Sequence, residues 1–191
     1  MRLLIDIAIA LLIATVLGVA TAWYAVENGR LFGAVHMPPW TAWPESGGPD
    51  ADPYAVAYLA RSGELPLGAG EGLAFLTFDD SAGEALDGDC TYFVTGQTPP
   101  ARLWTLTAYN RAGQLMRNVA GRYGFHSREL LRQEDGSLNI VLSADVQPGD
   151  WLPVARGAKL MLVLRLYDTP LTTATEFVDL DMPRIAKGEC R

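Results

Sequence analysis

Histidine, cysteine and basic residues are scarce in this sequence, and each scarcity excludes a class of site. The only histidines are His36 and His126, and the only cysteines are Cys90 and Cys190. None of them has metal-ligand or CxxC spacing, so a three-histidine zinc centre and a dithiol redox motif are excluded. Lys and Arg total 15 against 22 Asp and Glu, a net charge of −7. Nucleic-acid binding is therefore not expected, because phosphate backbones require a basic surface.

Recognisable catalytic and cofactor signatures are also missing. The sequence contains no GxSxG motif, and the neighbouring His126 and Ser127 do not form a nucleophile and base pair, since both stand on one predicted loop. We interpret Ser127 as the cap of a short turn over residues 128–132, with His126 exposed. No cofactor and no metal ion is predicted.

What the chain does contain, at its start, is one long apolar segment. Within residues 3–26 the only charged side chain is that of Asp6. As a helix with a rise of about 1.5 Å per residue they are long enough to cross a hydrocarbon core about 30 Å thick. We favour an uncleaved signal anchor over residues 1–27, because Trp23 and Tyr24 resemble the aromatic belt at a membrane surface. The alternative is a signal peptide cleaved after Ala22. In the favoured interpretation the lipid bilayer is a partner of residues 3–26.

The two cysteines bear on the compartment. Cys90 and Cys190 stand at opposite ends of the predicted domain, which favours a structural disulfide, and such bonds persist in oxidising compartments. This places the chain in the inner (cytoplasmic) membrane with a single pass, and its domain facing the periplasm or the cell exterior. The alternative is two unpaired buried thiols in a cytosolic domain.

Two segments follow the membrane helix. Residues 28–51 are rich in Pro, Gly and Trp, and we interpret them as an ordered lead-in, with Trp40 and Trp43 lying on the domain or the membrane surface. A short helix is then predicted, with Asp52 as its N-cap, Pro53 in its first turn and Gly63 as its stop. Residues 52–191 form the predicted domain.

Beyond residue 63 the apolar residues follow strand periodicity, with Gly, Pro and Asp turns between the runs. The predicted strands span residues 73–78, 90–95, 103–109, 137–143 and 159–167. Many short strands without alternating helices predict a mainly β fold, an antiparallel β-sandwich or jelly-roll-like domain with one short helix.

One cation marks a candidate ligand site. Arg165 interrupts the apolar strand 159–167, so its guanidinium either faces solvent, lines a cavity or is paired with a carboxylate. A cavity would be an amphipathic concavity for an anion or a sugar. The alternative is a structural ion pair, with Asp80 or Asp168 as the partner. The predicted ligand-binding residues are Arg102, Trp104, Arg165 and Tyr167.

Carboxylates supply two further hypotheses. A glycan hydrolase or lyase would use two of Asp79, Asp80, Asp150 and Asp168 as acid and base, which requires two carboxylates about 5–10 Å apart. A calcium site would use residues between 79 and 89, namely Asp79, Asp80, Glu84, Asp87 and Asp89. These lack the regular spacing of a calcium loop, so we favour a solvated hairpin loop.

Residues 52–190 also resemble the bacterial domain of unknown function family number 1214. The segments that carry the resemblance include residues 52–55, 63–68, 71–73, 90–92, 104–107, 135–138, 150–153, 164–170 and 183–185, with Asn118 and Cys190. Where that family commonly has Asn before Trp-Leu-Pro, this chain has Asp150. The resemblance implies a β-sandwich-like fold and no catalytic residues. It also implies a companion protein of the family number 1254 type, because that domain often accompanies this one.

These observations together predict a membrane-tethered envelope domain that binds a partner protein or an envelope glycan or lipid and is not an enzyme. The alternative function is a carboxylate-dependent glycan hydrolase or lyase in the periplasm.

Overall fold

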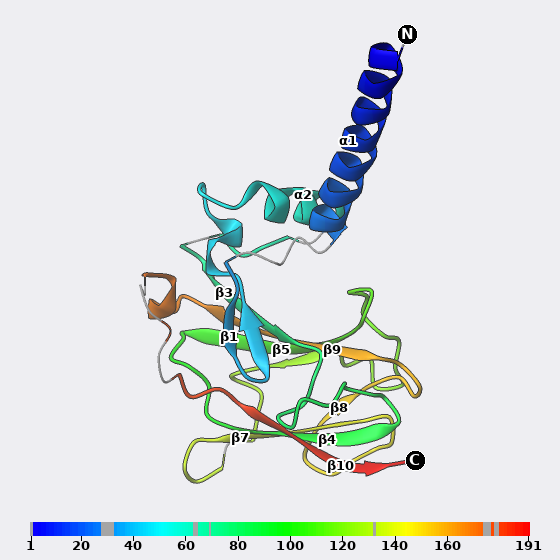
Figure 1. Ribbon diagram of the computed structural model, residues 1–191. Coiled ribbons are helices and arrows are strands. Elements are labelled where there is room, and N and C mark those ends of the chain that lie inside the picture. Colours follow the sequence, from blue (N-terminus) through cyan, green and yellow to red (C-terminus); the bar gives the residue numbers. More distant parts are fainter. Residues whose placement is uncertain are drawn as a thin grey trace.

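One protruding helix and two stacked β-sheets make up the protein (Figure 1). The computed structural model describes residues 2–27, 33–62, 65–68, 70–131, 133–173, 177 and 180–191. The predicted mainly β fold class is confirmed. Within the described residues, the helices are the N-terminal α1 (Arg2–Glu27), the short α2 (Pro53–Ser62) and two 3-10 helices, η1 (Pro44–Gly47) and η2 (Pro170–Thr173).

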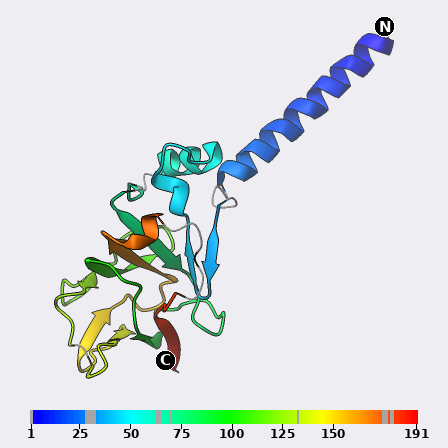
Figure 2. The same ribbon diagram turned by 90° about the vertical axis from the view of Figure 1, so that its left-hand side faces the viewer.

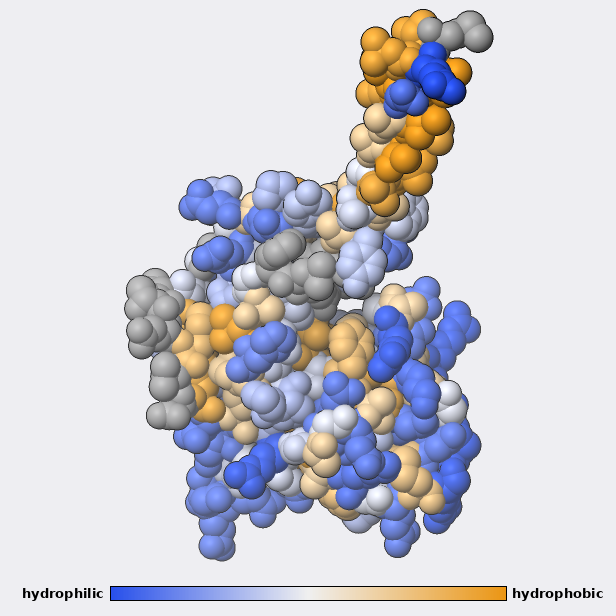
Figure 3. Space-filling model, in the orientation of Figure 1, coloured by the Kyte–Doolittle hydropathy of each residue, from blue (hydrophilic) through white to orange (hydrophobic). Residues whose placement is uncertain are grey.

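Helix α1 stands away from the sheets, and none of its 26 residues is buried (Figure 2). Its surface is apolar along most of its length (Figure 3). The hydroxyls of Thr15 and Thr21 donate hydrogen bonds to the carbonyl oxygens of Leu11 and Leu17, each at 2.8 Å, so neither hydroxyl needs water. The helix is long and apolar enough to span a membrane.

The larger sheet has six strands, and all of its neighbouring pairs are antiparallel. In spatial order they are β1 (Val35–Met37), β2 (Trp40–Ala42), β3 (Gly72–Thr77), β9 (Leu160–Tyr167), β5 (Leu103–Asn110) and β6 (Gly124–His126).

The smaller sheet has four strands and includes one parallel pair, β7 with β8, which differs from the expected antiparallel arrangement. Its spatial order is β10 (Arg184–Cys190), β4 (Cys90–Gly96), β7 (Leu138–Ser143) and β8 (Asp150–Pro153).

The core lies between the two sheets. Strand residues alternate between two faces, so Phe75, Leu106 and Leu164 point inward from three adjacent strands of the larger sheet. Tyr92 and Ile140 meet them from the smaller sheet, and all five side chains are fully or almost fully buried. This shared apolar layer holds the sheets together.

Part of the segment assigned to the lead-in belongs to the sandwich. Residues 35–42 form β1 and β2, and β2 pairs with β3. Trp40 is fully buried in the core, and its indole Nε1 donates a 2.7 Å hydrogen bond to the carbonyl oxygen of Pro183. The Pro38–Pro39 peptide bond between the two strands is cis. Strands of three residues around two prolines leave no periodic signal in the sequence.

Helix α2 begins as predicted. The carboxylate of Asp52 accepts hydrogen bonds from the backbone N–H groups of Tyr54 and Ala55, at 2.9 and 3.2 Å, which is the N-cap geometry. At its other end, Arg61 pairs with Glu27 at 2.8 Å and lies 4.4 Å from the ring centre of Trp23. These contacts place α2 at the foot of α1 (Figures 1 and 2).

Candidate functional site

A groove of about 550 Å³ lies between α2 and the outer face of the larger sheet, the face turned away from the core. This volume is within the range of small-molecule sites, about 300–1,000 Å³. The strands β3, β9 and β5 form its floor, α2 forms one wall, and Trp43, Pro44 and residues 65–67 form its rim.

The pairing register brings the floor residues together. Leu76 of β3 lies opposite Val163 of β9, and Met161 of β9 lies opposite Tyr109 of β5. These residues occupy the face opposite to the core because the side chains of a strand alternate. Met161 and Val163 are nonetheless only 7% and 5% exposed, so this face is covered as well.

The wall follows from helical periodicity. Ala55, Tyr58 and Leu59 of α2 line the groove, and their spacing of three and four residues puts them on one side of the helix. Tyr54 and Val56 lie off that side and are 41% and 50% exposed.

Two glycines allow the rim to approach the sheet closely. A side chain at Gly72, the first residue of β3, would collide with the carbonyl oxygen of Leu166 and meet the side chain of Leu67. One at Gly47 would collide with the carbonyl oxygen of Leu67. The segment at residues 65–68 can therefore lie against both η1 and the start of β3 only because Gly47 and Gly72 lack Cβ atoms.

Arg165 lies on the groove floor, half-buried. Its Nη1 donates a 3.2 Å hydrogen bond to the hydroxyl oxygen of Tyr109, and its Cζ lies 5.7 Å from the centre of that ring. It forms no ion pair with any carboxylate of the described residues. The two alternative partners are engaged elsewhere, since Asp168 pairs with Arg102 and Asp80 accepts backbone hydrogen bonds.

A second guanidinium stands over the same floor. Arg111, in the turn after β5, is exposed and lies 5.5 Å from the ring centre of Phe78. Of the described residues that line the groove, two are arginines and none is acidic or a lysine. In a chain with a net charge of −7, this groove is a local site of positive charge.

The four residues predicted to bind a ligand do not lie together. Trp104 is 2% exposed and points into the core. Arg102, just before β5, and Asp168, just after β9, form a largely exposed ion pair at 3.1 Å. Tyr167 shares the outer face with Arg165 but does not line the groove, so only Arg165 does.

Sequence reasoning missed Tyr109, Arg111 and the residues of α2 and η1 as site residues. One signal for the groove was available: strand 159–167 is apolar on both faces, which indicates that both faces are covered.

The carboxylates proposed as acid and base do not converge. Asp80, 2% exposed, accepts hydrogen bonds from the N–H groups of Ala82 and Glu84 at 2.8 and 2.9 Å and so shapes its own loop. Asp168 follows the opposite end of the β3–β9 pair, about 20 Å away along the strand at about 3.4 Å per residue. Asp150 belongs to the smaller sheet.

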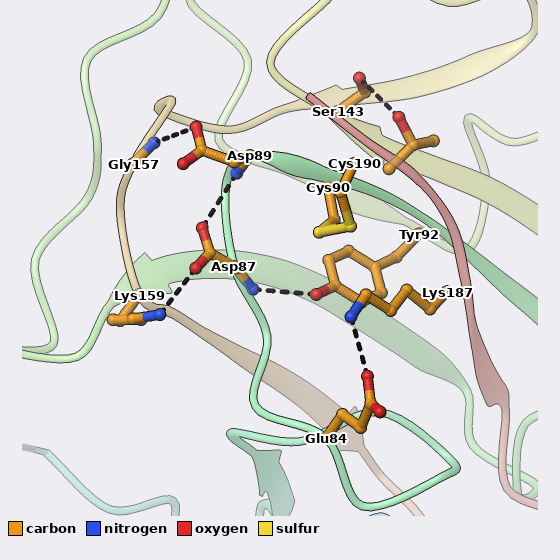
Figure 4. The surroundings of a disulfide bond; sticks show 11 residues. Glu84, Asp87, Asp89, Cys90, Tyr92, Ser143, Gly157, Lys159, Lys187 and Cys190 are labelled. Atoms are coloured by element: carbon orange, nitrogen blue, oxygen red, sulfur yellow. Dashed lines mark hydrogen bonds and ion pairs between the residues drawn. A yellow bond between two sulfur atoms is a disulfide. The ribbon is translucent and has the colours of Figure 1, made fainter.

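The acidic loop between residues 79 and 89 is tied to neighbouring segments (Figure 4). Its pairs are Glu84 with Lys187 at 2.8 Å, Asp87 with Lys159 at 2.6 Å, and Asp89 with the N–H of Gly157 at 2.9 Å. Within the described part of the chain, no three His, Cys, Asp or Glu residues are grouped to hold a metal ion. Three of the five carboxylates in the calcium hypothesis thus connect the loop to β10 and to the segment just before β9.

These contacts shift two pKa values in opposite directions. The hydrogen bond from Lys159 and that from the N–H of Asp89 lower the pKa of Asp87. The hydrogen bond to Glu84 raises the pKa of Lys187. Both shifts favour the charged forms that make the ion pairs.

The disulfide joins the two strands at this side of the smaller sheet. Cys90 begins β4, Cys190 ends β10, and the two are register partners joined through their sulfur atoms (Figure 4). Tyr92 lies beside them, fully buried, with its hydroxyl accepting a 3.0 Å hydrogen bond from the N–H of Asp87. Burial raises the pKa of Tyr92.

This chain is similar to proteins of known structure. The VPA0106 protein from Vibrio parahaemolyticus is 23% identical, with a TM-score of 0.59 over 73% of this chain and 36% of its own. An uncharacterised protein from Burkholderia cenocepacia is 21% identical, with a TM-score of 0.42 over 78% of this chain and 47% of its own. The chain thus spans between a third and a half of the length of these proteins. The likeness to the Vibrio protein shows the fold alone.

Among curated proteins, none matches this sequence. The model of the family described as "Protein of unknown function (DUF1214)" matches residues 71–171, which include β3, β4, β5, β7 and β9. The matched region covers just over half of the chain. The chain therefore belongs to the DUF1214 family.

Proposed function

We propose that this protein is a membrane-anchored, non-catalytic binding domain and that the groove between α2 and the larger sheet is its ligand site. The observation that carries the proposal is the character of the groove: it has the volume of a small-molecule site, many apolar side chains in its lining, and arginines as the only charged side chains among the described residues that line it. Ligand sites commonly combine apolar walls with a few polar groups that fix orientation.

The state of Arg165 supports a binding role. A half-buried guanidinium beside Tyr109 has lost part of its hydration without gaining a described carboxylate as a partner. An anionic ligand would supply that partner, because the planar guanidinium donates to carboxylate or phosphate oxygens in pairs. The groove therefore favours a ligand with an anionic group and an apolar body.

The geometry favours binding over catalysis. Glycan hydrolysis by a carboxylate pair needs two carboxyl groups about 5–10 Å apart across one cleft. Of the four candidate carboxylates, those at residues 79 and 80 lie at one end of the strand pair, Asp168 lies beyond the other end, and Asp150 lies in the other sheet. None of them lines the groove.

The proposed location is the inner membrane, with the domain in the periplasm or outside the cell. The apolar α1 supports a single-pass anchor, and the disulfide supports an oxidising compartment. A companion protein of the family number 1254 type stays a prediction, as does a further role in assembly.

The test is to identify small molecules that copurify with the full-length chain from its native membrane. Wild type is compared with Ala74→Phe, which fills the groove floor, and with Val119→Phe, a matched change at a 96% exposed position. We expect native mass spectrometry to find a bound small molecule in wild type and Val119→Phe that is lost from Ala74→Phe. A wild-type protein without a bound small molecule, or an Ala74→Phe protein that retains it, would contradict the proposal.

A further inference from the structure

We infer that the ligand of the groove is a single-chain amphiphile with an anionic head, its carboxylate or phosphate held by Arg165 and Tyr109 and its acyl chain lying beneath α2. This inference rests on the proposed function, because it names the class of molecule that the same groove binds.

The head-group site consists of two adjacent donors. The hydroxyl oxygen of Tyr109 accepts the hydrogen bond from Nη1 of Arg165, so its own O–H proton is available to donate. The remaining N–H groups of the guanidinium can donate to the same anion, and hydrogen bonds between charged groups are the stronger kind. Arg111, above Phe78 on the same floor, adds positive charge, and no described residue of the lining is acidic.

The path for the chain is apolar. From Arg165 to Met161 the floor extends four residues along β9, about 13 Å at about 3.3 Å per residue. Along it, Val163 and Met161 face Leu76 and the ring of Tyr109, and Leu59 of α2 closes the space from the opposite wall. A sugar chain needs hydrogen-bonding groups along its whole length, and the side chains of Val163, Met161 and Leu76 supply none along this stretch of the floor. An acyl chain needs none.

The position of the groove points to the membrane as the place where the ligand enters. The wall formed by α2 rests on the foot of α1, where Arg61 contacts Trp23 and Glu27. Aromatic residues such as Trp23 mark the level of lipid head groups at the end of a membrane helix. On the nearby surface, Val56 and Leu65 are 50% and 91% exposed. Amphiphiles concentrate at this level of the bilayer, so the groove lies beside their reservoir.

Two sources supply this chemistry: a free fatty acid with a carboxylate head, and a lysophospholipid with a phosphate head. The experiment uses the full-length protein in nanodiscs of zwitterionic lipid. The probes are three amphiphiles that carry the same photoreactive diazirine in the middle of a palmitoyl-length chain. Their heads are a carboxylate, a glycerol phosphate and a neutral alcohol. After irradiation, labelled peptides are mapped by mass spectrometry.

Helix α1 serves as the internal reference, since none of its residues is buried and we expect every probe to label it. The measured quantity is the labelling of groove peptides from α2, β3 and β9 divided by the labelling of α1. We expect this ratio to be at least about tenfold higher for an anionic probe than for the alcohol, as loss of hydrogen bonds to a charged group predicts. The anionic probe with the higher ratio identifies the source.

Variants locate the head group. Arg165→Met should lower the ratio for the anionic probe by about tenfold or more, and Arg165→Lys should restore part of it because it restores the charge. Arg102→Met is the matched control, because it removes an arginine of the same sheet that pairs with Asp168 outside the groove, and it should leave the ratio unchanged. Melting curves of all variants confirm equal folding.

Each of the other possible results contradicts a specific part of the inference. If the alcohol labels the groove as well as the acids do, the groove binds amphiphiles without regard to charge: the proposed function stands and the anionic head is wrong. If Arg165→Met labels like wild type, the head is not held there. If no probe labels the groove above background while α1 is labelled, the inference fails, and the copurification experiment then decides the proposed function separately.

Discussion

The loss of folding stability on removal of the disulfide between Cys90 and Cys190 can be calculated from the length of the loop that the bond closes. The two residues are separated by 100 positions, so the bond closes the part of the domain from β4 to β10 into a loop. In the chain-entropy model a loop of this size stabilises the folded state by about 4.7 kcal/mol at 25 °C, by restricting the unfolded chain. For a chain of 191 residues, that free energy corresponds to a fall in Tm of roughly 10–20 °C when the bond is removed.

The perturbation is made in two ways, by reduction of the wild-type protein and by the double substitution Cys90→Ala with Cys190→Ser. Cys90 is 6% exposed and takes the apolar replacement, while Cys190 is exposed and takes the polar one. Unfolding by guanidinium chloride, followed by tryptophan fluorescence, gives the free energy and the m-value. The double variant should unfold like reduced wild type and should not respond to reductant.

The m-value separates two explanations of a loss of stability. A higher m-value indicates that the native state is intact and that the unfolded chain has become less compact, as opening of the loop predicts. A lower m-value indicates that β10 has detached from β4 in the native state, so that less surface remains to be exposed. A loss below about 1 kcal/mol with an unchanged m-value would refute the reasoning from loop closure.

Three further predictions concern the core and the charged loop. Trp40→Phe should cost about 1–3 kcal/mol in guanidinium unfolding, because a buried carbonyl oxygen loses its donor; an unchanged midpoint would show that this bond contributes nothing. The pKa of Asp87 is lower in the folded protein than its unfolded value near 3.8, so the protein loses stability as the pH falls below that value and the ion pair with Lys159 is lost. Lys159→Met should weaken this acid dependence, and a pH profile identical to that of wild type would contradict the assignment. The pKa of Tyr92 is higher in the folded protein than its unfolded value near 10.0, so its contribution to stability is fully present below that pH and is lost as the pH rises above it. Tyr92→Phe should reduce this loss of stability at alkaline pH, and a loss of the same size in the variant would assign it to other groups.

Much of the fold was predictable where periodicity or capping is strong. The strands expected over residues 103–109 and 159–167 correspond to β5 and β9 within one residue at each end, and Asp52 caps α2 as expected. Their runs are long enough for the apolar alternation to be unambiguous.

The strands that the sequence analysis did not predict have physical reasons for their weak signals. β1, β2 and β6 are three residues each, and β1 and β2 flank two prolines. β8 is four residues, and β10 carries charged residues and Gly188 because most of its side chains face solvent at the edge of its sheet. Short or edge strands are held by their partners rather than by their own pattern.

Of the residues that line the groove, only Arg165 was predicted from the sequence, because it is the one charged residue in an apolar strand. Trp104, on another predicted strand, was expected to complete a concavity with Arg165, but the register pairs Thr105 with Arg165 and Trp104 with Leu166. A difference of one residue in register moves a side chain to the other face of the sheet. Registers between strands more than 50 residues apart in the chain are not available from one sequence, so the face that Trp104 occupies was not determined.

The central claim, that the groove binds an anionic amphiphile, is tested most directly by a crystal structure of the full-length protein with a fatty acid brominated near the end of its chain. Anomalous scattering then locates the bromine atom. The account predicts a bromine peak between α2 and β9, with the carboxylate within hydrogen-bond distance of Arg165 and Tyr109. Bromine peaks along α1 alone, with water filling the groove, would contradict it.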